Sequence, residues 1–232
     1  MADDLDLKGF NNRCRLFPLP GVVLFPHAVL PLHIFETRYR QMTEDAIATD
    51  KLVTIVQLCS SPILKPTSML GTPAIEEIAC LGQILQHERL PDGRLNFLLL
   101  GRKRVRLTRE IPTGKLYRSA EAEIIAERDN DSEPDDSQRA ELIALFRRIF
   151  ERNNEVDPYL AALLENQQPM GILTDIIAHA LTMPSIVKQR FLDEPHVGRR
   201  VEALRTILRQ AVLRESNEPE ESRRFPPPFS MN

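Results

Sequence analysis

The sequence contains no tryptophan and few cysteines, and each shortage excludes a class of site. Because none of the 232 residues is tryptophan, a binding cage built from tryptophan is excluded, and aromatic residues as a whole make up only 6%. The three cysteines, Cys14, Cys59 and Cys80, are odd in number, and no Cys-x-x-Cys pair occurs. Neither a zinc knuckle nor a redox motif is therefore expected. The cysteines lie in or close to apolar runs, which predicts small core residues in a reducing compartment.

The chain also lacks a strong net charge and a long hydrophobic run. Its formal charge is −3 and its isoelectric point is about 6.0, so no global field would attract nucleic acid or an anionic membrane. No apolar run approaches the ~18 residues that cross a bilayer. The acidic start, Met-Ala-Asp-Asp, lacks the hydrophobic stretch of a signal peptide. We therefore expect a cytoplasmic protein without a membrane partner.

Residues 14–126 show the pattern of strands with one helix among them. Apolar or alternating runs predict strands over 16–19, 29–35, 52–58, 78–88, 94–100, the stretch after Gly101, and 117–126. The helix follows Glu36, where Tyr39, Met42 and Ala46 recur at helical spacing. Leu90-Pro-Asp-Gly93 predicts a tight turn between two strands. Short antiparallel strands with turn-rich connections favour a compact barrel or sandwich.

An acidic segment separates this β-rich part from a helical one. Residues 127–136 carry six acidic side chains against one basic one, which disfavours packing. After it, helical periodicity predicts a bundle over 137–214, with helices near 137–150, 158–166, 171–181 and 186–192 and a last one from Pro195. The predicted organisation also includes an extension over 1–13 and this acidic linker. It ends in a polar, Pro-rich tail over 215–232, which we expect to be disordered.

Three groups of residues form motifs that can be compared with known families. The longest is the segment Leu16–Met42, with its Pro-Leu-Pro, Val-Leu-Phe-Pro and Leu-Pro-Leu-His-Ile-Phe-Glu-x-Arg-Tyr motifs. The second combines Gly82, Asp92-Gly93 and Leu100-Gly101 with Arg104. The third is more general and lies in the helical part: Asp175, Lys188-Gln189, Leu192, and Arg199 or Arg200. Together these groups resemble the Lon protease N-terminal domain family over about residues 14–214. The resemblance implies an α+β fold, in which a PUA-like β pseudo-barrel with one helix precedes a C-terminal helical bundle.

The resemblance implies capture of unfolded or tagged polypeptide, but not the chemistry of an ATP-dependent protease. A phosphate-binding loop needs Gly-x-x-x-x-Gly-Lys-[Ser/Thr], whose backbone amides cradle phosphate. The sequence has one Gly-Lys pair, Gly114-Lys115, followed by Leu116 and without the earlier glycine. No match to the Ser–Lys protease motif is found either. We therefore expect a recognition module with no catalytic residue, cofactor or metal.

The densest basic run suggests an alternative, an RNA-binding barrel that would use Arg102, Lys103, Arg104 and Arg106. Strict strand alternation would spread these residues over both faces, and no aromatic residue lies between them for base stacking. A solvent-exposed barrel face is therefore the favoured interpretation of this run, and nucleic acid is not the expected partner.

Several smaller motifs have an ordinary structural interpretation beside a functional one. His33 and Glu36 suggest a metal or acid–base site, but two ligands make a poor zinc site, and a structural hydrogen bond is favoured. Arg38 and Arg40 suggest a peptide groove, whereas an ion pair between Arg40 and Glu44 is the favoured alternative. Phe35, Tyr39 and Met42 are expected in the core, and 225–229, Phe-Pro-Pro-Pro-Phe, is a candidate polyproline ligand.

Taken together, these features predict non-enzymatic polypeptide recognition, as an adaptor or chaperone-like holder. Contact is expected through apolar patches and main-chain edges of the β-rich part. A separate protease or chaperone is a candidate second partner, and the peptide-binding residues are not identified by the sequence. Salt separates the two hypotheses, because phosphate contacts weaken steeply with salt and apolar contacts do not.

Overall fold

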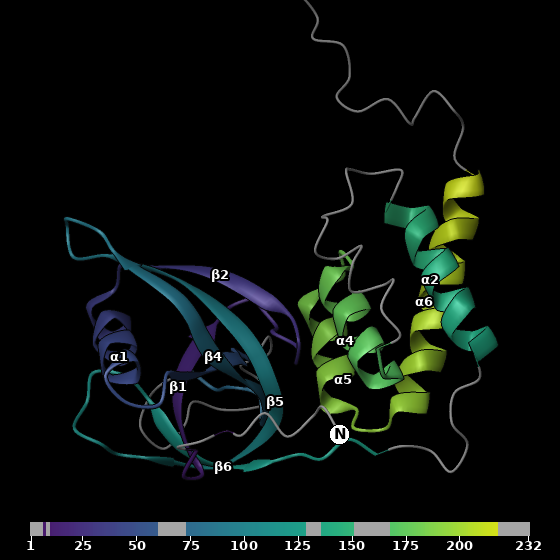
Figure 1. Ribbon diagram of the computed structural model, residues 1–232. Coiled ribbons are helices and arrows are strands. Elements are labelled where there is room, and N and C mark those ends of the chain that lie inside the picture. The colour runs from purple at the N-terminus through teal and green to yellow at the C-terminus, as the bar shows by residue number, and fades with distance from the viewer. Residues whose placement is uncertain (1–6, 8–9, 60–72, 129–135, 151–167, 218–232) are drawn as a thin grey trace, which may run out of the picture.

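The computed structural model describes residues 7, 10–59, 73–128, 136–150 and 168–217. In the described part, strands lie between residues 13 and 124, and four helices lie between residues 136 and 217. Figure 1 shows the strands gathered on one side of the molecule and these four helices on the other. The predicted α+β class is confirmed, whereas the division into separate domains, linker and tail stays a prediction.

The strands form one sheet that closes on itself. In chain order they are β1 (Arg13–Leu19), β2 (Val29–Ile34), β3 (Leu52–Gln57), β4 (Ile78–Arg89), β5 (Leu95–Ile111) and β6 (Ser119–Ile124). The order in the sheet is β2-β5-β4-β3-β1-β6, and β5 also pairs with β6. Five strands therefore make a closed ring, and β2 is attached outside it along the first part of β5. β1 and β3 are parallel, contrary to the antiparallel expectation, because a long crossover through β2 and α1 connects them.

β5 is one strand of 17 residues rather than the two expected on either side of Gly101. It changes its partners along its length, from β2 and β4 at its start to β6 at its end. The pairing with β4 shifts register between Leu81 and Gly82, which makes Arg102 an extra residue on β5. Such a β-bulge bends the strand and redirects its side chains.

Gly101 lets the chain cross β5 at close range. The Gly101 carbonyl accepts a hydrogen bond from the His27 amide at 2.8 Å, and its own amide donates to the Ala28 carbonyl at 2.9 Å. A Cβ atom at this position would lie 2.0 Å from the Phe25 carbonyl oxygen. Glycine is therefore required here by the approach of another backbone segment.

Two groups of buried apolar residues hold the fold together. One lies inside the ring and draws on all five of its strands, with members that include Leu16, Ala79, Val105 and Ala120. Small side chains are common in it, as the narrow lumen of a small barrel requires. The other group continues from the outside of the ring into the helices and contains both Phe25 and Phe146. The β-rich and helical parts thus share a continuous core.

The cysteines and helices largely follow the sequence pattern. Burial raises the pKa of Cys14 to about 11 and raises that of Cys80 as well, which keeps both thiols protonated and unreactive.

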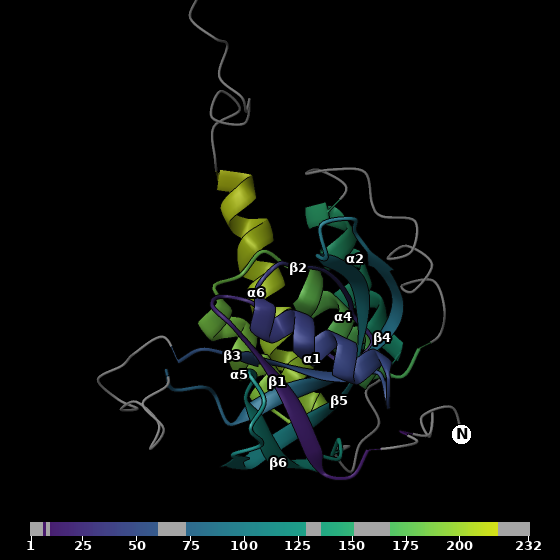
Figure 2. The same cartoon turned by 90° about the vertical axis from the view of Figure 1, so that its left-hand side faces the viewer.

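The helices are α1 (Thr37–Ile47), α2 (Asp136–Phe150), α4 (Met170–Ala180), α5 (Ser185–Asp193) and α6 (Val197–Asn217). Figure 2 shows α1 in front of the strands, with the bundle helices behind them. The helix expected over 158–166, the tail with its 225–229 motif, and most of 1–13 lie outside the described residues.

None of the described helices combines the length and apolar character that crossing a membrane would require. The longest, α6, has 21 residues, and arginines and glutamates recur along it.

Replacing Gly101 with alanine should lower the free energy of unfolding by about 2–3 kcal/mol, because the new methyl group collides with the Phe25 backbone. Urea denaturation monitored by circular dichroism would measure this. Gly114→Ala is the control, because a Cβ there meets no atom within 4 Å and its φ of 69° costs an alanine about 1 kcal/mol. Equal losses in the two variants would show that the crossing at Gly101 is not tight.

Candidate functional site

The junction between barrel and bundle is centred on a buried ion pair. Arg104 of β5 binds Asp175 of α4 through two hydrogen bonds, Nη1 to Oδ2 at 2.8 Å and Nη2 to Oδ1 at 2.5 Å. The side chains are 2% and 1% exposed. Burial alone lowers the pKa of Arg104, but the charge of Asp175 and its hydrogen bonds outweigh burial and raise the pKa overall. Arg104 therefore stays charged inside the protein.

Two further charged side chains complete this network. Arg200 of α6 donates from Nη1 to Asp175 Oδ1 at 3.1 Å and from Nη2 to Glu127 Oε1. Arg104 Nη1 lies 3.4 Å from the same Glu127 oxygen. Two arginines thus face two carboxylates, and the charge is balanced where water is scarce. We call Arg104, Glu127, Asp175 and Arg200 the junction network.

Backbone contacts fix the junction network to α4 and α5. Arg104 Nε donates to the carbonyl of Leu192 at 3.0 Å. The Glu127 carboxylate lies against Gly171 in the first turn of α4, where a Cβ would come 2.3 Å from its Oε2. A negative charge is favourable at this end of a helix, and Pro169, which precedes α4, gives it no side-chain cap. Glu127 therefore places a negative charge beside the N-terminal turn of α4.

Other residues of the predicted resemblance also connect the two parts. Gln189 of α5 donates from Nε2 to the Ile78 carbonyl of β4 at 2.9 Å. Lys188 donates to the carbonyl of His179 at 2.6 Å, within the bundle. Gln189 thus helps Asp175, Leu192 and Arg200 to hold the bundle in its position on the barrel, whereas Lys188 connects two helices of the bundle.

His179 of α4 is a half-buried base at this same junction. Its ring lies edge-on to Phe25, with 6.3 Å between ring centroids. Burial, together with the nearby charge of Lys188, lowers the pKa of His179 to about 4, although a hydrogen bond to the Val23 backbone opposes the shift. The imidazole is therefore neutral at physiological pH.

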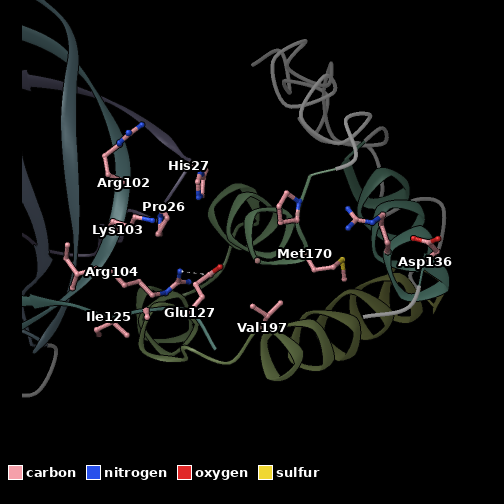
Figure 3. A pocket seen from close by; sticks show the side chains of 15 residues that line it. Pro26, His27, Arg102, Lys103, Arg104, Ile125, Glu127, Asp136, Met170 and Val197 are labelled. Atoms are coloured by element: carbon pink, nitrogen blue, oxygen red, sulfur yellow. Dashed lines mark hydrogen bonds and ion pairs between the residues drawn. The ribbon is translucent and has the colours of Figure 1, made fainter. Parts of the chain in front are cut away.

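A cleft of about 790 Å³ opens beside the junction network. Pro26, His27, Arg102 and Lys103 line it on the barrel side, and Met170 and Asp136 line it on the bundle side (Figure 3). Arg139 of α2 also lines it and donates to the Gln168 carbonyl. The junction network fixes the position of the bundle relative to β5, and the cleft is the space left beside it between barrel and bundle.

A half-buried row of side chains on β5 leads toward this cleft. Burial alternates along the first half of the strand, so Leu95, Phe97 and Leu99 face the core while the residues between them face outward. We call the outward residues Asn96, Leu98, Leu100 and Arg102 the β5 row. Its first part borders a shallow groove of about 400 Å³, together with Pro31, Gln86 and other residues of β2 and β4. The β5 row therefore joins a mainly apolar groove to a polar cleft.

The open edge of the sheet is less suited to binding than the sequence suggests. β2 pairs with β5 alone among the described strands. The Gly101 amide bonds the Ala28 carbonyl, so the alternating register directs the main-chain groups of Pro31 toward the open edge. Proline has no N–H to give there, which interrupts pairing with an added strand. The outer face of β5 is thus better suited to contact than the β2 edge.

The structure does not bring the four residues of the basic run onto one surface. Arg102 and Lys103 both line the cleft, because the bulge at Arg102 interrupts the alternation that predicted opposite faces. Arg104 is buried in the junction network, and Arg106 is exposed outside the cleft. The interpretation of the whole run as an exposed face fails for Arg104.

The polar side chains of the smaller motifs near the start of α1 form hydrogen bonds and ion pairs, as the structural interpretation of His33 and Glu36 expects. His33 Nδ1 is 2.6 Å from Asn96 Oδ1, and Glu36 accepts from Arg38 Nε at 2.9 Å. Glu44 pairs with Arg89 at 2.5 Å instead of forming the expected pair with Arg40. Tyr39 and Met42 are in the core as predicted.

Phe35 is the exception among the expected core residues, because 64% of it is exposed. It lies between β2 and α1, where the chain changes from strand to helix and its side chain turns outward.

Within the described residues, no group of three or more histidine, cysteine or acidic side chains is placed to hold a metal ion.

A closed barrel joined to a helical bundle, with an open cleft at the junction, defines a domain of the α+β class. The chain belongs to the family of ATP-dependent protease La (LON) substrate-binding domains, whose model matches residues 13–210.

Curated Lon proteases are similar in sequence to this chain. The Lon protease of Xanthomonas oryzae pv. oryzae is 27% identical over 189 residues, which cover 82% of this chain and 22% of that protein. The Lon protease of Rhizobium meliloti is 25% identical over 187 residues, which cover 81% of this chain and 23% of that protein. This chain thus spans about a quarter of the length of these curated relatives.

The likeness extends to solved structures. A Lon N-terminal domain protein from Xanthomonas campestris gives a TM-score of 0.58 at 23% identity, covering 83% of this chain and 96% of that one. The N-terminal domain of a Mycobacterium avium complex Lon protease gives 0.56 at 15% identity. At these identities the structures establish a shared fold.

Replacing Asp175 with asparagine should lower the free energy of unfolding by about 3–5 kcal/mol, because Arg104 and Arg200 would lose the buried charge that balances them. Urea denaturation at neutral pH would measure this loss. Glu44→Gln is the control, since it breaks the exposed pair with Arg89 and should leave stability close to wild type. Similar losses in both variants would mean that burial adds nothing to the pair.

Stability should fall as the pH is lowered from about 7 to 4 through His179. In that window the unfolded chain binds a proton on this histidine and the folded protein does not, so the folded state loses on the order of 3 kcal/mol. Comparing unfolding free energies of wild type and His179→Leu at several pH values tests this, with the exposed His87→Gln as control. An unchanged pH slope in His179→Leu would show that the histidine is not held neutral.

Proposed function

We propose that this chain binds extended polypeptide along the β5 row and into the cleft. The observation that carries the proposal is the pair of half-buried leucines, Leu98 and Leu100, on an outer face that leads into the junction cleft. The family to which the chain belongs is described as substrate-binding, which supports polypeptide as the ligand. Apolar side chains of an unfolded segment would cover the two leucines and remove them from water.

The dimensions of the β5 row suit a short extended segment. From Asn96 to Arg102 the strand rises about 20 Å, which is the length of about six extended residues. Binding across the face needs no main-chain pairing with β2, so Pro31 does not obstruct it. Side-chain contact of this kind tolerates many sequences, as capture of unfolded chains requires.

The proposed role is recognition without catalysis. The sequence carries neither the phosphate-binding loop nor the Ser–Lys motif, which supports a module with no ATPase or peptidase chemistry of its own. Such a module would act as an adaptor or holder in the cytoplasm, and a separate protease or chaperone is its candidate partner. RNA is the less favoured ligand, because Arg104 is used inside the protein.

Replacing Leu98 with aspartate should weaken binding of a labelled, permanently unfolded polypeptide by about tenfold or more, because an apolar contact is replaced by a hydrated charge. Fluorescence anisotropy at low and high salt would measure it, and wild-type binding should persist at high salt. Leu213→Asp is the matched control, since Leu213 is 62% exposed on α6, away from the β5 row. Equal weakening in both variants, or binding that disappears with salt, would contradict the proposal.

A further inference from the structure

We propose that two side-chain amides on the outer face of the barrel bind the main chain of the captured segment, so that the site selects extended polypeptide by its free peptide groups. This inference rests on the proposed function and adds how the ligand is recognised. Asn96 of β5 and Gln86 of β4 would form hydrogen bonds with the main chain of the ligand, and Leu98 beside them would cover its apolar side chains.

The strand register brings both amides onto the same face as Leu98. Asn96 precedes Leu98 by two residues on β5, so the two side chains point the same way. Gln86 of β4 is paired with Leu98 of β5, and paired residues share a face of the sheet. All three residues line the shallow groove of about 400 Å³. The groove lies near the β4–β5 turn, which Figure 1 shows on the side of the barrel away from the bundle.

A β-bulge on β4 is the reason that an amide lies opposite Leu98. Ile84 pairs with Leu99, and the next pair joins Gln86 to Leu98, so Leu85 is an extra residue on β4. Without the bulge, Leu85 would take the place of Gln86 in this pair. The irregularity therefore places a hydrogen-bonding side chain, rather than a second leucine, beside the apolar residues of the β5 row.

The hydrogen bonds of His33 determine which way the Asn96 amide is turned. Arg94 Nη1 lies 3.2 Å from His33 Nε2, and because a guanidinium can only donate, Nε2 accepts and the ring hydrogen is on Nδ1. Nδ1 therefore donates to Asn96 Oδ1 at 2.6 Å. Arg94 is itself held by Asp92, with 2.6 Å between Nε and Oδ2. This chain of contacts uses the oxygen of the Asn96 amide and leaves its Nδ2 group as the donor toward a ligand.

Within the part of the chain that the structure describes, neither amide donor is used. Asn96 contacts His33 through Oδ1, and no hydrogen bond is found there for the Gln86 side chain. Asn96 is half-buried and Gln86 is exposed, so both can be reached from solvent. Asn96 Nδ2 can donate to a ligand carbonyl, and the Gln86 amide can donate to a carbonyl or accept from an N–H.

The spacing of the two amides matches the repeat of an extended main chain. Two residues of a strand span about 7 Å, which separates the level of Asn96 from that of Gln86 along the sheet. Main-chain groups on one side of an extended ligand recur at the same interval, because its peptide groups alternate in direction. In a helix, the peptide groups between the ends are already bonded to one another. The two amides therefore suit an extended segment and would bind its peptide groups whatever its side chains are.

Two fluorescent peptides with identical side chains test this inference on the full chain. Both carry a block of leucine and valine between glycine–serine ends, and in one of them the amides of the block are replaced by esters. An ester has no N–H and its carbonyl is a weaker acceptor, whereas the apolar side chains are unchanged. We expect the amide peptide to bind about tenfold more tightly, as two hydrogen bonds of ordinary strength allow, and to keep this advantage at high salt.

Variants assign the difference to the two amides. Asn96→Asp keeps the oxygen that accepts from His33 and replaces the donor with a second oxygen, and Gln86→Met removes the amide at similar size. The two changes together should weaken binding of the amide peptide about tenfold, to the affinity of the ester peptide. Asn11→Asp combined with Gln210→Met is the matched control, since it makes the same changes at exposed residues outside the groove and should keep the tenfold difference.

The remaining outcomes separate this inference from the proposed function. If wild type binds both peptides equally, main-chain recognition is wrong, and capture through apolar side chains stands. If the tenfold difference persists in the Asn96→Asp and Gln86→Met double variant, the main-chain contacts lie elsewhere and the assignment to these amides is overturned. If neither peptide binds wild type, the proposed function fails and the inference fails with it.

Discussion

The buried pair of Arg104 and Asp175 is the interaction on which the rest of the structure depends. It joins the longest strand to the second described helix of the bundle, and both side chains are almost fully removed from water. Burying charges is costly, so such a pair contributes little if its geometry is imperfect. Here two hydrogen bonds join the side chains directly. The Leu192 carbonyl and the charges of Glu127 and Arg200 add further contacts that compensate for lost hydration. Apolar packing continues across the same junction, and the ionic contacts fix how the bundle is oriented on it.

The candidate binding surface is a consequence of that orientation. A strand with one outward apolar row is common, but this row ends where the bundle stands away from the barrel and leaves a cleft. Gly101 admits the crossing backbone, and the bulge beside it directs Arg102 and Lys103 into the opening. One irregularity in β5 thus separates an apolar half of the surface from a basic half.

Much of the fold could be predicted from the sequence, because most elements follow local patterns. Alternation, turn residues and helical periodicity locate the strands and the described helices, and the Leu16–Met42 motifs indicate the family. The site could not be predicted in the same way. Arg104 looks like its neighbours in a basic run, and its burial depends on Asp175, which is 71 residues away in the chain. Glu127 belongs to the segment predicted as an acidic linker, yet its carboxylate pairs with Arg200 and lies against the first turn of α4. Strict alternation also fails at Arg102, because a bulge depends on the partner strand and not on local sequence.

The most direct test is to observe where an unfolded polypeptide touches the protein. Methyl groups labelled for nuclear magnetic resonance would be followed during titration with a permanently unfolded chain. We expect the largest shifts at Leu98 and Leu100, with a smaller change at Met170 in the cleft, and none at Leu213 or inside the barrel at Leu16. Shifts concentrated instead on the α5–α6 surface, at Val187 and Ile207, would contradict binding along β5 and move the recognition site to the bundle.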